Sequence, residues 1–154
     1  MTEQQDLWTI ESSEDSKQLI LSSLDKTNTC IIYLYGATIT SWKSNNIERL
    51  LLSKSAILDG TKAIRGGIPL VFPQFGQPLT TMLQHGFARI STWELLSHEI
   101  KSDSVTCDLS LNYTEETLKV WPHKFQLIYT ITLSSCSLIT KLTINNIDDK
   151  AFQC

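Results

Sequence analysis

The amino-acid sequence predicts an all-β protein built as an antiparallel β-sandwich. The first observation is a period of two: apolar and polar side chains alternate almost without exception over residues 105–113, and again over 125–133. The second is that short strand-like runs recur between turn signals along the chain. The third is that no stretch carries a helical pattern longer than about two turns. Together these features favour a sandwich over a barrel or an α/β sheet.

The strand-like runs follow one another from residue 29 onward. Residues 29–35 are rich in β-branched and aromatic side chains and stop at Gly36, after which extended character resumes. Residues 114–124, T-E-E-T-L-K-V-W-P-H-K, form a turn or a short helical connection, and Pro122 forces extended backbone into the next strand. The expected strands are, in order, 29–35, 38–43, 48–53, 93–100, 105–113, 125–133 and 138–145.

Length and composition fit one domain that spans residues 1–154. A hydrophobic content of 42 % suits a packed core, and no linker or low-complexity tract interrupts the chain. The net charge of -3 comes from interspersed signs, which argues against a nucleic-acid partner or a polybasic membrane surface. No apolar run approaches ~18 residues and the first residues lack a signal-peptide pattern, so we expect a cytoplasmic protein.

The sequence offers little support for metal, nucleotide or nucleophile chemistry. It contains no G-x-x-x-x-G-K-S/T, no G-x-G-x-x-G after a strand, no G-x-S-x-G and no H-E-x-x-H. Four cysteines, Cys30, Cys107, Cys136 and Cys154, are widely spaced without a C-x-x-C pair, and three of them fall in strand-like patterns. Buried free thiols are therefore favoured over disulfides or metal ligands.

Four polar residues outside the strand patterns are candidates for ligand binding. Arg65 precedes a double glycine in R-G-G-I-P-L-V-F-P-Q-F-G, and Gln84, His85 and Arg89 lie in Q-H-G-F-A-R. Glycines let a backbone approach a ligand, and prolines restrict the segment, so an arginine there is held at a fixed place. Two converging guanidinium groups would suit a phosphate. The alternative for each arginine is a surface or carboxylate-paired residue, and for His85 a structural or solvated one.

Three motifs, in order and at similar spacing, resemble a known family. They are G-A-T-I-T-S-W-K, L-D-G-T-K-A-I-R-G-G-I-P-L-V-F-P-Q-F-G and L-Q-H-G-F-A-R-I-S-T-W-E-L-L. They are similar to the N-terminal half of the hexose-6-phosphate mutarotases, also called glucose-6-phosphate 1-epimerases, which are relatives of the galactose mutarotases. The resemblance implies a galactose-mutarotase-type β-sandwich that interconverts the α and β anomers of a hexose 6-phosphate in carbohydrate metabolism without a cofactor.

The resemblance also assigns roles to the four candidates. Arg65, Gln84 and Arg89 would contact the substrate, with the arginines as phosphate ligands, and His85 would lie beside the sugar. In the family the catalytic acid is a histidine and the base a glutamate, both in later sequence, and the histidine directly follows a segment resembling A-F-Q-C. We therefore expect this chain to be an N-terminal fragment without the catalytic pair, inactive by itself and incomplete as a sandwich.

Two alternative interpretations give the chain no catalytic role. A noncatalytic sugar-phosphate binding or regulatory module would keep Arg65, Gln84 and Arg89 without the proton-transfer pair, and a decayed product would bind nothing. Because missing strands leave open sheet edges and an uncovered apolar face, the chain is also expected to associate with itself through those edges.

Overall fold

The computed structural model describes residues 7–154. Within this range the chain forms an antiparallel β-sandwich with one short α-helix and one 3₁₀ turn. The elements are β1 (Trp8–Ser12), β2 (Gln18–Ser23), β3 (Thr29–Tyr33), β4 (Thr38–Ser44), β5 (Ile47–Glu48), η1 (Ala88–Ile90), β6 (Glu94–Ile100), β7 (Ser104–Asn112), α1 (Glu115–Val120), β8 (Phe125–Ser134) and β9 (Leu138–Asn146).

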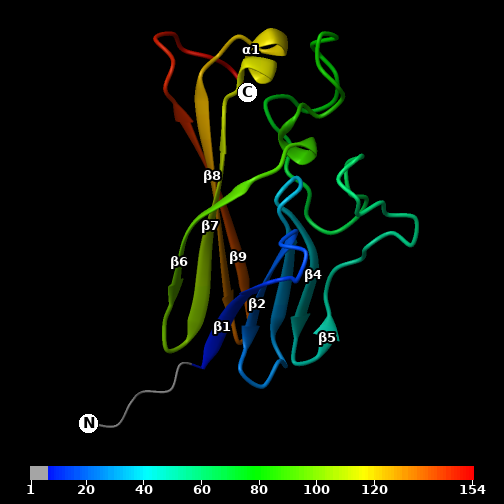
Figure 1. Ribbon diagram of the computed structural model, residues 1–154, viewed down its shortest axis with the longest axis vertical. Helices are drawn as coiled ribbons and strands as arrows, with labels where there is room; N and C mark the ends of the chain where they lie inside the picture. The colour runs from blue at the N-terminus through cyan, green and yellow to red at the C-terminus, as the bar shows by residue number, and fades with distance from the viewer. Residues whose placement is uncertain (1–6) are drawn as a thin grey trace.

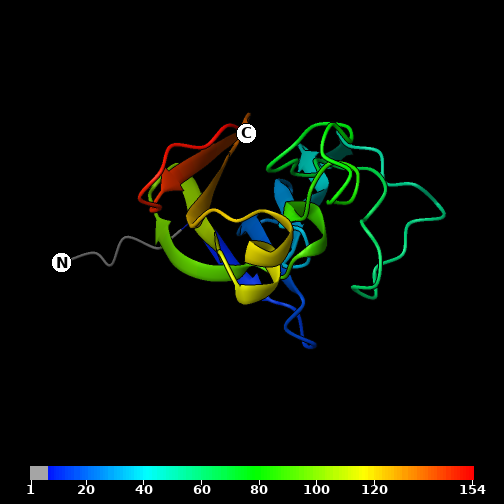
Figure 2. The same cartoon turned by 90° about the horizontal axis from the view of Figure 1, so that it is seen from above.

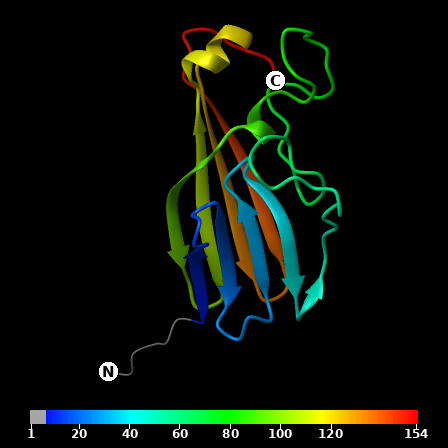
Figure 3. The same ribbon diagram turned by 45° about the vertical axis from the view of Figure 1, so that its right-hand side comes forward.

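The strands form two layers (Figure 1). One sheet has the order β1-β2-β3-β4-β5 and the other β6-β7-β8-β9, so within each sheet every strand pairs with its neighbours in sequence. The layers meet where β1 and β2 lie across from β7, and Figure 3 shows the first sheet in front of the second. Seen from above, the long segment between β5 and β6 extends to the side away from β6–β9 (Figure 2). It is this segment that carries the candidate residues.

The core forms because strand alternation places one apolar face of each sheet inward. In β8 buried and half-buried residues alternate over the whole strand, as the sequence pattern predicts. Fully buried side chains from both sheets meet in the interior, together with Trp93 just before β6; among those from the sheets are Leu21, Ile32, Ile39, Leu109, Leu127 and Ile131. Burying such side chains contributes about 1.5–3 kcal/mol each, which makes this interface the main source of stability.

Two parts of the strand prediction are wrong. The first is the omission of β1 and β2, which precede residue 29. The second is a strand over 48–53, because β5 ends at Glu48 and only an isolated bridge from Leu52 to Gly66 follows. The carboxylate of Glu48 accepts the main-chain N–H of Leu50 at 3.1 Å, which takes the donor that a continuing strand would need. Asn45 and Asn46, both at positive φ, make the tight turn that brings β5 onto β4.

Glu48 stabilises this hairpin only while its carboxyl group is ionised. Partial burial alone would raise its pKa, but hydrogen bonds outweigh burial and hold the pKa below its ordinary value of 4.5. The donors are the hydroxyl of Ser41 and the main-chain N–H groups of Leu50, Trp42 and Arg49. A lowered pKa in the folded state means stability that is present above pH 4.5 and is lost as the pH falls through the folded pKa.

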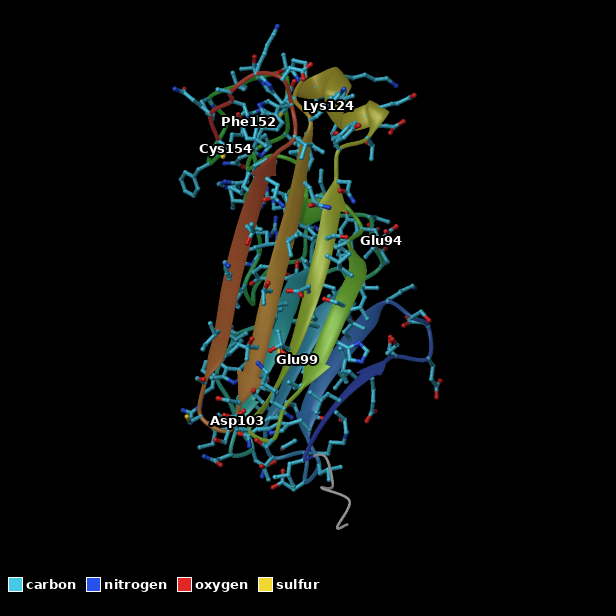
Figure 4. The ribbon with its side chains drawn as sticks, turned by 90° about the vertical axis from the view of Figure 1, so that its left-hand side faces the viewer. Glu94, Glu99, Asp103, Lys124, Phe152 and Cys154 are labelled. Atoms are coloured by element: carbon cyan, nitrogen blue, oxygen red, sulfur yellow. The ribbon has the colours of Figure 1, made fainter. Side chains whose placement is uncertain are left out.

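We therefore expect Glu48→Gln to lower the free energy of unfolding by about 1 kcal/mol at pH 7, and by much less at pH 3. Urea unfolding of the variant and the parent at both pH values measures this difference. Glu94→Gln is the matched control, because Glu94 lies exposed on β6 (Figure 4) and should change stability little at either pH. A deficit in Glu48→Gln that is equal at pH 7 and pH 3 would contradict the role of the ionised group.

The connection between β7 and β8 is the short helix α1, in agreement with the sequence prediction. The Thr114 side chain accepts the N–H of Thr117, and the Thr117 hydroxyl accepts the N–H of Thr114, which forms a reciprocal cap at the start of α1. The helix ends at Val120, just before Trp121 and Pro122. None of the helices within residues 7–154 is long and apolar enough to cross a membrane.

The cysteine prediction holds for two of the four residues. All four are free, but only Cys30 and Cys107 are buried, in β3 and β7, where burial raises the pKa of both thiols, that of Cys107 to about 12. Cys136 and Cys154 are exposed, contrary to the prediction. Cys136 lies in the turn closed by hydrogen bonds between Ser134 and Ser137, so its exposure is set by the turn and not by the alternation of a strand.

In the part of the chain that the structure describes, β9 pairs only with β8. Its residues Leu138, Leu142 and Ile144 lie opposite the buried Leu133, Tyr129 and Leu127 of β8 and so face the same side of the sheet. They are nevertheless only partly covered, and Ile144 is 40 % exposed. Self-association through this edge stays a prediction.

Candidate functional site

All four candidate residues lie in the segment between β5 and β6. The segment gathers beyond the end of the first sheet where β3 turns into β4 (Figures 1 and 3). Two isolated bridges tie it there, one between Ile68 and Ile39 of β4 and one between Thr92 and Tyr35 at the end of β3. A rigid sandwich thus presents these loops at one end, where β proteins commonly place ligand-contacting groups.

Arg65 is exposed and stands at the head of a segment whose backbone is fixed on both sides. Its carbonyl accepts the N–H of Ser53 at 3.0 Å. Two residues further, Gly67 N–H donates to the carbonyl of Leu51 at 2.9 Å, and Ile68 N–H donates to that of Ile39 at 2.9 Å. Within residues 7–154 the guanidinium group of Arg65 makes no hydrogen bond or ion pair. The side chain is therefore available to a ligand while its backbone is held.

The double glycine is required by this close packing. Gly66 has φ +105° and Gly67 has φ +64°, both in the region that L side chains rarely adopt. A Cβ atom on Gly66 would lie 2.5 Å from the carbonyl oxygen of Leu51, and one on Gly67 would lie 2.0 Å from that of Ile39. The R-G-G sequence therefore lets the chain run between two neighbouring backbones immediately after Arg65.

His85 belongs to a loop, residues 74–86, that is closed on itself. His85 N–H donates to the Gly76 carbonyl at 2.7 Å, and Gly76 N–H donates to Nδ1 of the His85 ring at 3.0 Å. The ring also lies against Phe75, with centroids 5.0 Å apart. Because Nδ1 accepts a hydrogen bond, the neutral ring carries its proton on Nε2.

Arg89 lies in η1 and is bonded to the same loop. Its Nη2 donates to the carbonyl oxygen of Gln84 at 2.8 Å, and its Nε is buried without a hydrogen-bond partner in the described part of the chain. Buried polar groups are nearly always paired, so this N–H is unusual. Gln84 itself is exposed, which leaves its amide free to point into solvent or toward a ligand.

The structure therefore brings Gln84, His85 and Arg89 into one hydrogen-bonded unit. Arg65 is on the neighbouring segment, which is joined to that unit by a parallel bridge between Phe72 and Gly86. Within residues 7–154 no hydrogen bond connects Arg65 with the other three. Convergence of the two arginines on one ligand stays a prediction.

Gln74 is a residue of this region that the sequence did not single out. It is 7 % exposed, and its carboxamide bonds to main-chain groups across the 74–86 loop. A glutamine whose partners are main-chain groups cannot be recognised from the spacing of other side chains. Its position within F-P-Q-F-G was the one feature of the sequence that could have indicated it.

The other histidines lie away from these loops. His98 is exposed on β6, and His123 packs beside Trp121 and Phe152 with Nδ1 3.4 Å from a carboxylate oxygen of Asp148. Figure 4 shows Phe152 and the neighbouring Lys124 at the α1 end of the second sheet. The Lys124 N–H bonds to Asp148 and holds the pKa of that carboxyl below its ordinary value. These groups form a structural cluster around the end of α1.

A cleft of about 630 Å³ lies between residues 77–92 and the end of β7 with α1. Its walls are mainly apolar, with Met82, Phe87 and Ile90 on one side and Leu111 and Val120 on the other. None of the four candidate residues lines it. The candidate site is thus a loop surface and not this cleft.

The arrangement offers cations and neutral hydrogen-bond donors to an anionic, oxygen-rich ligand. Guanidinium groups form strong charge-assisted bonds to phosphate oxygens, and the Nε2 proton of His85 suits a hydroxyl or ether oxygen. Among the four candidates only His85 has a side chain of a type that commonly acts as a general acid or base. The set therefore fits recognition of a phosphorylated polyol better than proton transfer at two opposed positions.

Known proteins resemble this chain both in sequence and in fold. A plant protein from Cenchrus ciliaris with the description "Putative glucose-6-phosphate 1-epimerase" is 41 % identical over 133 residues, which is 79 % of this chain and 39 % of the relative. A protein of Escherichia coli K12 with the same description is 42 % identical over 97 residues, 62 % of this chain and 33 % of its own length. The chain thus spans about two fifths or less of these curated relatives.

Solved structures confirm the predicted sandwich of galactose-mutarotase type. A protein of Salmonella typhimurium described as a "putative mutarotase" superposes with a TM-score of 0.76 at 26 % identity, over 90 % of this chain and 47 % of the other. A galactose mutarotase-like protein from Clostridium acetobutylicum gives a TM-score of 0.72 at 18 % identity, over 94 % and 50 %. The family model for aldose 1-epimerase matches residues 18–154, which include every strand except β1 and every candidate residue. By sequence and by fold, the chain belongs to the aldose 1-epimerase family.

Proposed function

We propose that the chain binds a hexose 6-phosphate through Arg65, Gln84, His85 and Arg89, as the substrate-binding part of a glucose-6-phosphate 1-epimerase. The two arginines bind the phosphate group, and Gln84 and His85 contact the sugar. The observation that carries this proposal is the 41 % identity over 133 residues to a protein with that description, a stretch long enough to make the shared family specific.

The geometry supports the binding half of this function. The Arg65 side chain is exposed at the end of a fixed backbone, and the loop with Gln84, His85 and Arg89 is fixed by its own hydrogen bonds. Fixed donors lose little conformational entropy when a ligand binds. A dianionic phosphate on two guanidinium groups gains charge-assisted bonds that an unphosphorylated sugar lacks.

Anomer exchange requires more than these four residues. One group must take the proton from the C1 hydroxyl while another protonates the ring oxygen, so that the ring opens and closes again on the opposite face. Arginine and glutamine do not transfer protons at neutral pH, which leaves His85 as the one candidate for two opposed roles. We therefore expect the 154-residue chain to bind the substrate without accelerating the exchange.

Titration of the purified chain with glucose 6-phosphate and with glucose tests both the binding of the phosphate and the absence of accelerated anomer exchange. Calorimetry should give a dissociation constant for glucose 6-phosphate at least about tenfold lower than for glucose, because only the former presents a phosphate. NMR of the same samples should show anomer exchange at the buffer rate. Equal affinity for the two sugars would contradict the phosphate site, and exchange above the buffer rate would show that the chain holds a proton-transfer pair.

A further inference from the structure

Gln74 is a buried polar residue in a loop that is otherwise largely exposed. Its Oε1 accepts the N–H of Leu79 at 2.9 Å, and its Nε2 donates to the carbonyl oxygens of Leu79 at 3.2 Å and Leu83 at 3.3 Å. One carboxamide thus uses both of its ends to hold two points of the loop. Buried amides that are fully bonded in this way rigidify their surroundings.

The loop positions held by Gln74 lead directly to the candidate residues. Leu83, whose carbonyl accepts from Gln74, precedes Gln84, whose carbonyl accepts from Arg89 at 2.8 Å. The next residue, His85, is tied to Gly76 by two hydrogen bonds, of 2.7 and 3.0 Å. Three successive residues are therefore each bonded to a different partner, and Gln74 supplies the first of these bonds.

His85 adopts a backbone conformation that needs such support. Its φ is +66°, which is uncommon for a residue with a side chain and costs of order 1 kcal/mol or more. Such conformations persist where surrounding bonds over-determine them. If the loop relaxed, His85 would return to negative φ, the bond from Gly76 N–H to Nδ1 would break, and the Nε2 proton would lose its fixed direction.

We propose that Gln74 is a positioning residue of the sugar-phosphate site. Its carboxamide holds the 74–86 loop so that His85 presents Nε2–H as a hydrogen-bond donor to an oxygen of the sugar, beside Gln84 and Arg89. The identity of the ligand rests on the function proposed above, whereas the order of the loop and the tautomer of His85 do not. The proposed ligand and the proposed role of Gln74 can therefore be refuted independently.

The test uses Gln74→Glu, which keeps the shape and one acceptor but loses both N–H donors. At pH 7 the ionised carboxylate faces the two carbonyl oxygens of Leu79 and Leu83, so the loop should loosen and the dissociation constant for glucose 6-phosphate should rise about tenfold. At lower pH the introduced carboxyl group is protonated and regains one donor. The ratio of the variant's dissociation constant to the parent's, measured at each pH, should then fall toward one.

Two further variants make the result interpretable. Gln77→Glu is the matched control, because Gln77 is an exposed glutamine of the same loop with one bond, from Nε2 to the Met82 carbonyl at 3.2 Å, and its affinity should stay within about twofold of the parent. Gln74→Met retains volume without charge and should lose affinity at every pH. A purely structural role for Gln74 would not produce a pH-dependent affinity that only the carboxyl variant shows.

A second readout needs no ligand. Amide hydrogen exchange of Leu79 and His85 should be faster in Gln74→Glu at pH 7 while the core strands stay protected, and ring ¹⁵N shifts should show the Nε2–H tautomer of His85 in the parent. Unchanged exchange at these amides overturns the positioning role. So does parent-like affinity in a variant whose loop exchanges faster. Absence of glucose 6-phosphate binding in the parent would refute the proposed function, and the exchange data would still decide the role of Gln74.

Discussion

Replacing Gly67 by alanine is expected to lower the free energy of unfolding by about 3 kcal/mol or more. Two costs add in the same residue. The backbone is held at φ +64°, and the new Cβ would lie 2.0 Å from the carbonyl oxygen of Ile39, a distance at which the backbone has to move. It cannot move freely, because the Ile68 N–H donates to that same oxygen and the Gly67 N–H donates to Leu51.

Gly76→Ala is the matched control for this prediction. Gly76 has nearly the same backbone angle, φ +69°, but apart from its chain neighbours no atom of residues 7–154 lies within 4 Å of the position that a Cβ would take. It should therefore show the backbone strain alone, about 1 kcal/mol. Urea unfolding of both variants measures the two costs. If Gly67→Ala were no less stable than Gly76→Ala, the close approach of the R-G-G segment to β4 would be contradicted.

The sequence predicted the second sheet well because buried and less buried residues alternate along its central strands. β7 and β8 have one buried and one half-buried face along most of their length, so burial follows the period of two directly. The prediction omitted β2 because polar side chains are buried there as well as apolar ones. Ser22 is fully buried and Ser23 nearly so, next to the buried Leu21. In β1 only Trp8 is buried, and a five-residue strand with one buried side chain has no readable period.

The sequence marked the two candidate segments but not how they lie against each other. Glycines beside Arg65 and His85 marked both segments in the sequence, and the structure gives the reason, since a Cβ at either Gly67 or Gly86 would collide with a carbonyl oxygen. The pairing of Phe72 with Gly86, and the bonds from Gln74, arise between irregular segments. Contacts of that kind follow no period, so a single sequence contains no signal for them.

Arg65→Ala should raise the dissociation constant for glucose 6-phosphate by about ten- to a hundredfold and leave the affinity for glucose and the melting temperature unchanged. The reason is that the guanidinium group has no bond to lose within residues 7–154, so its whole effect falls on the ligand. Arg49→Ala, at another exposed arginine just after β5, is the control for a general loss of positive charge and should change affinity little.

Arg89→Ala should differ from Arg65→Ala in a way that separates a ligand contact from a structural one. It removes the bond from Nη2 to the Gln84 carbonyl, so it should lower the melting temperature and weaken the binding of both sugars, in addition to the loss specific to phosphate. Arg89→Lys keeps a charge without the planar fork and should restore only part of the phosphate affinity. Calorimetry with both sugars and thermal unfolding of each variant measure these effects. If Arg65→Ala and Arg89→Ala each bound glucose 6-phosphate as the parent does, neither arginine would be a phosphate ligand, and the fixed R-G-G segment would serve the packing of β4 alone.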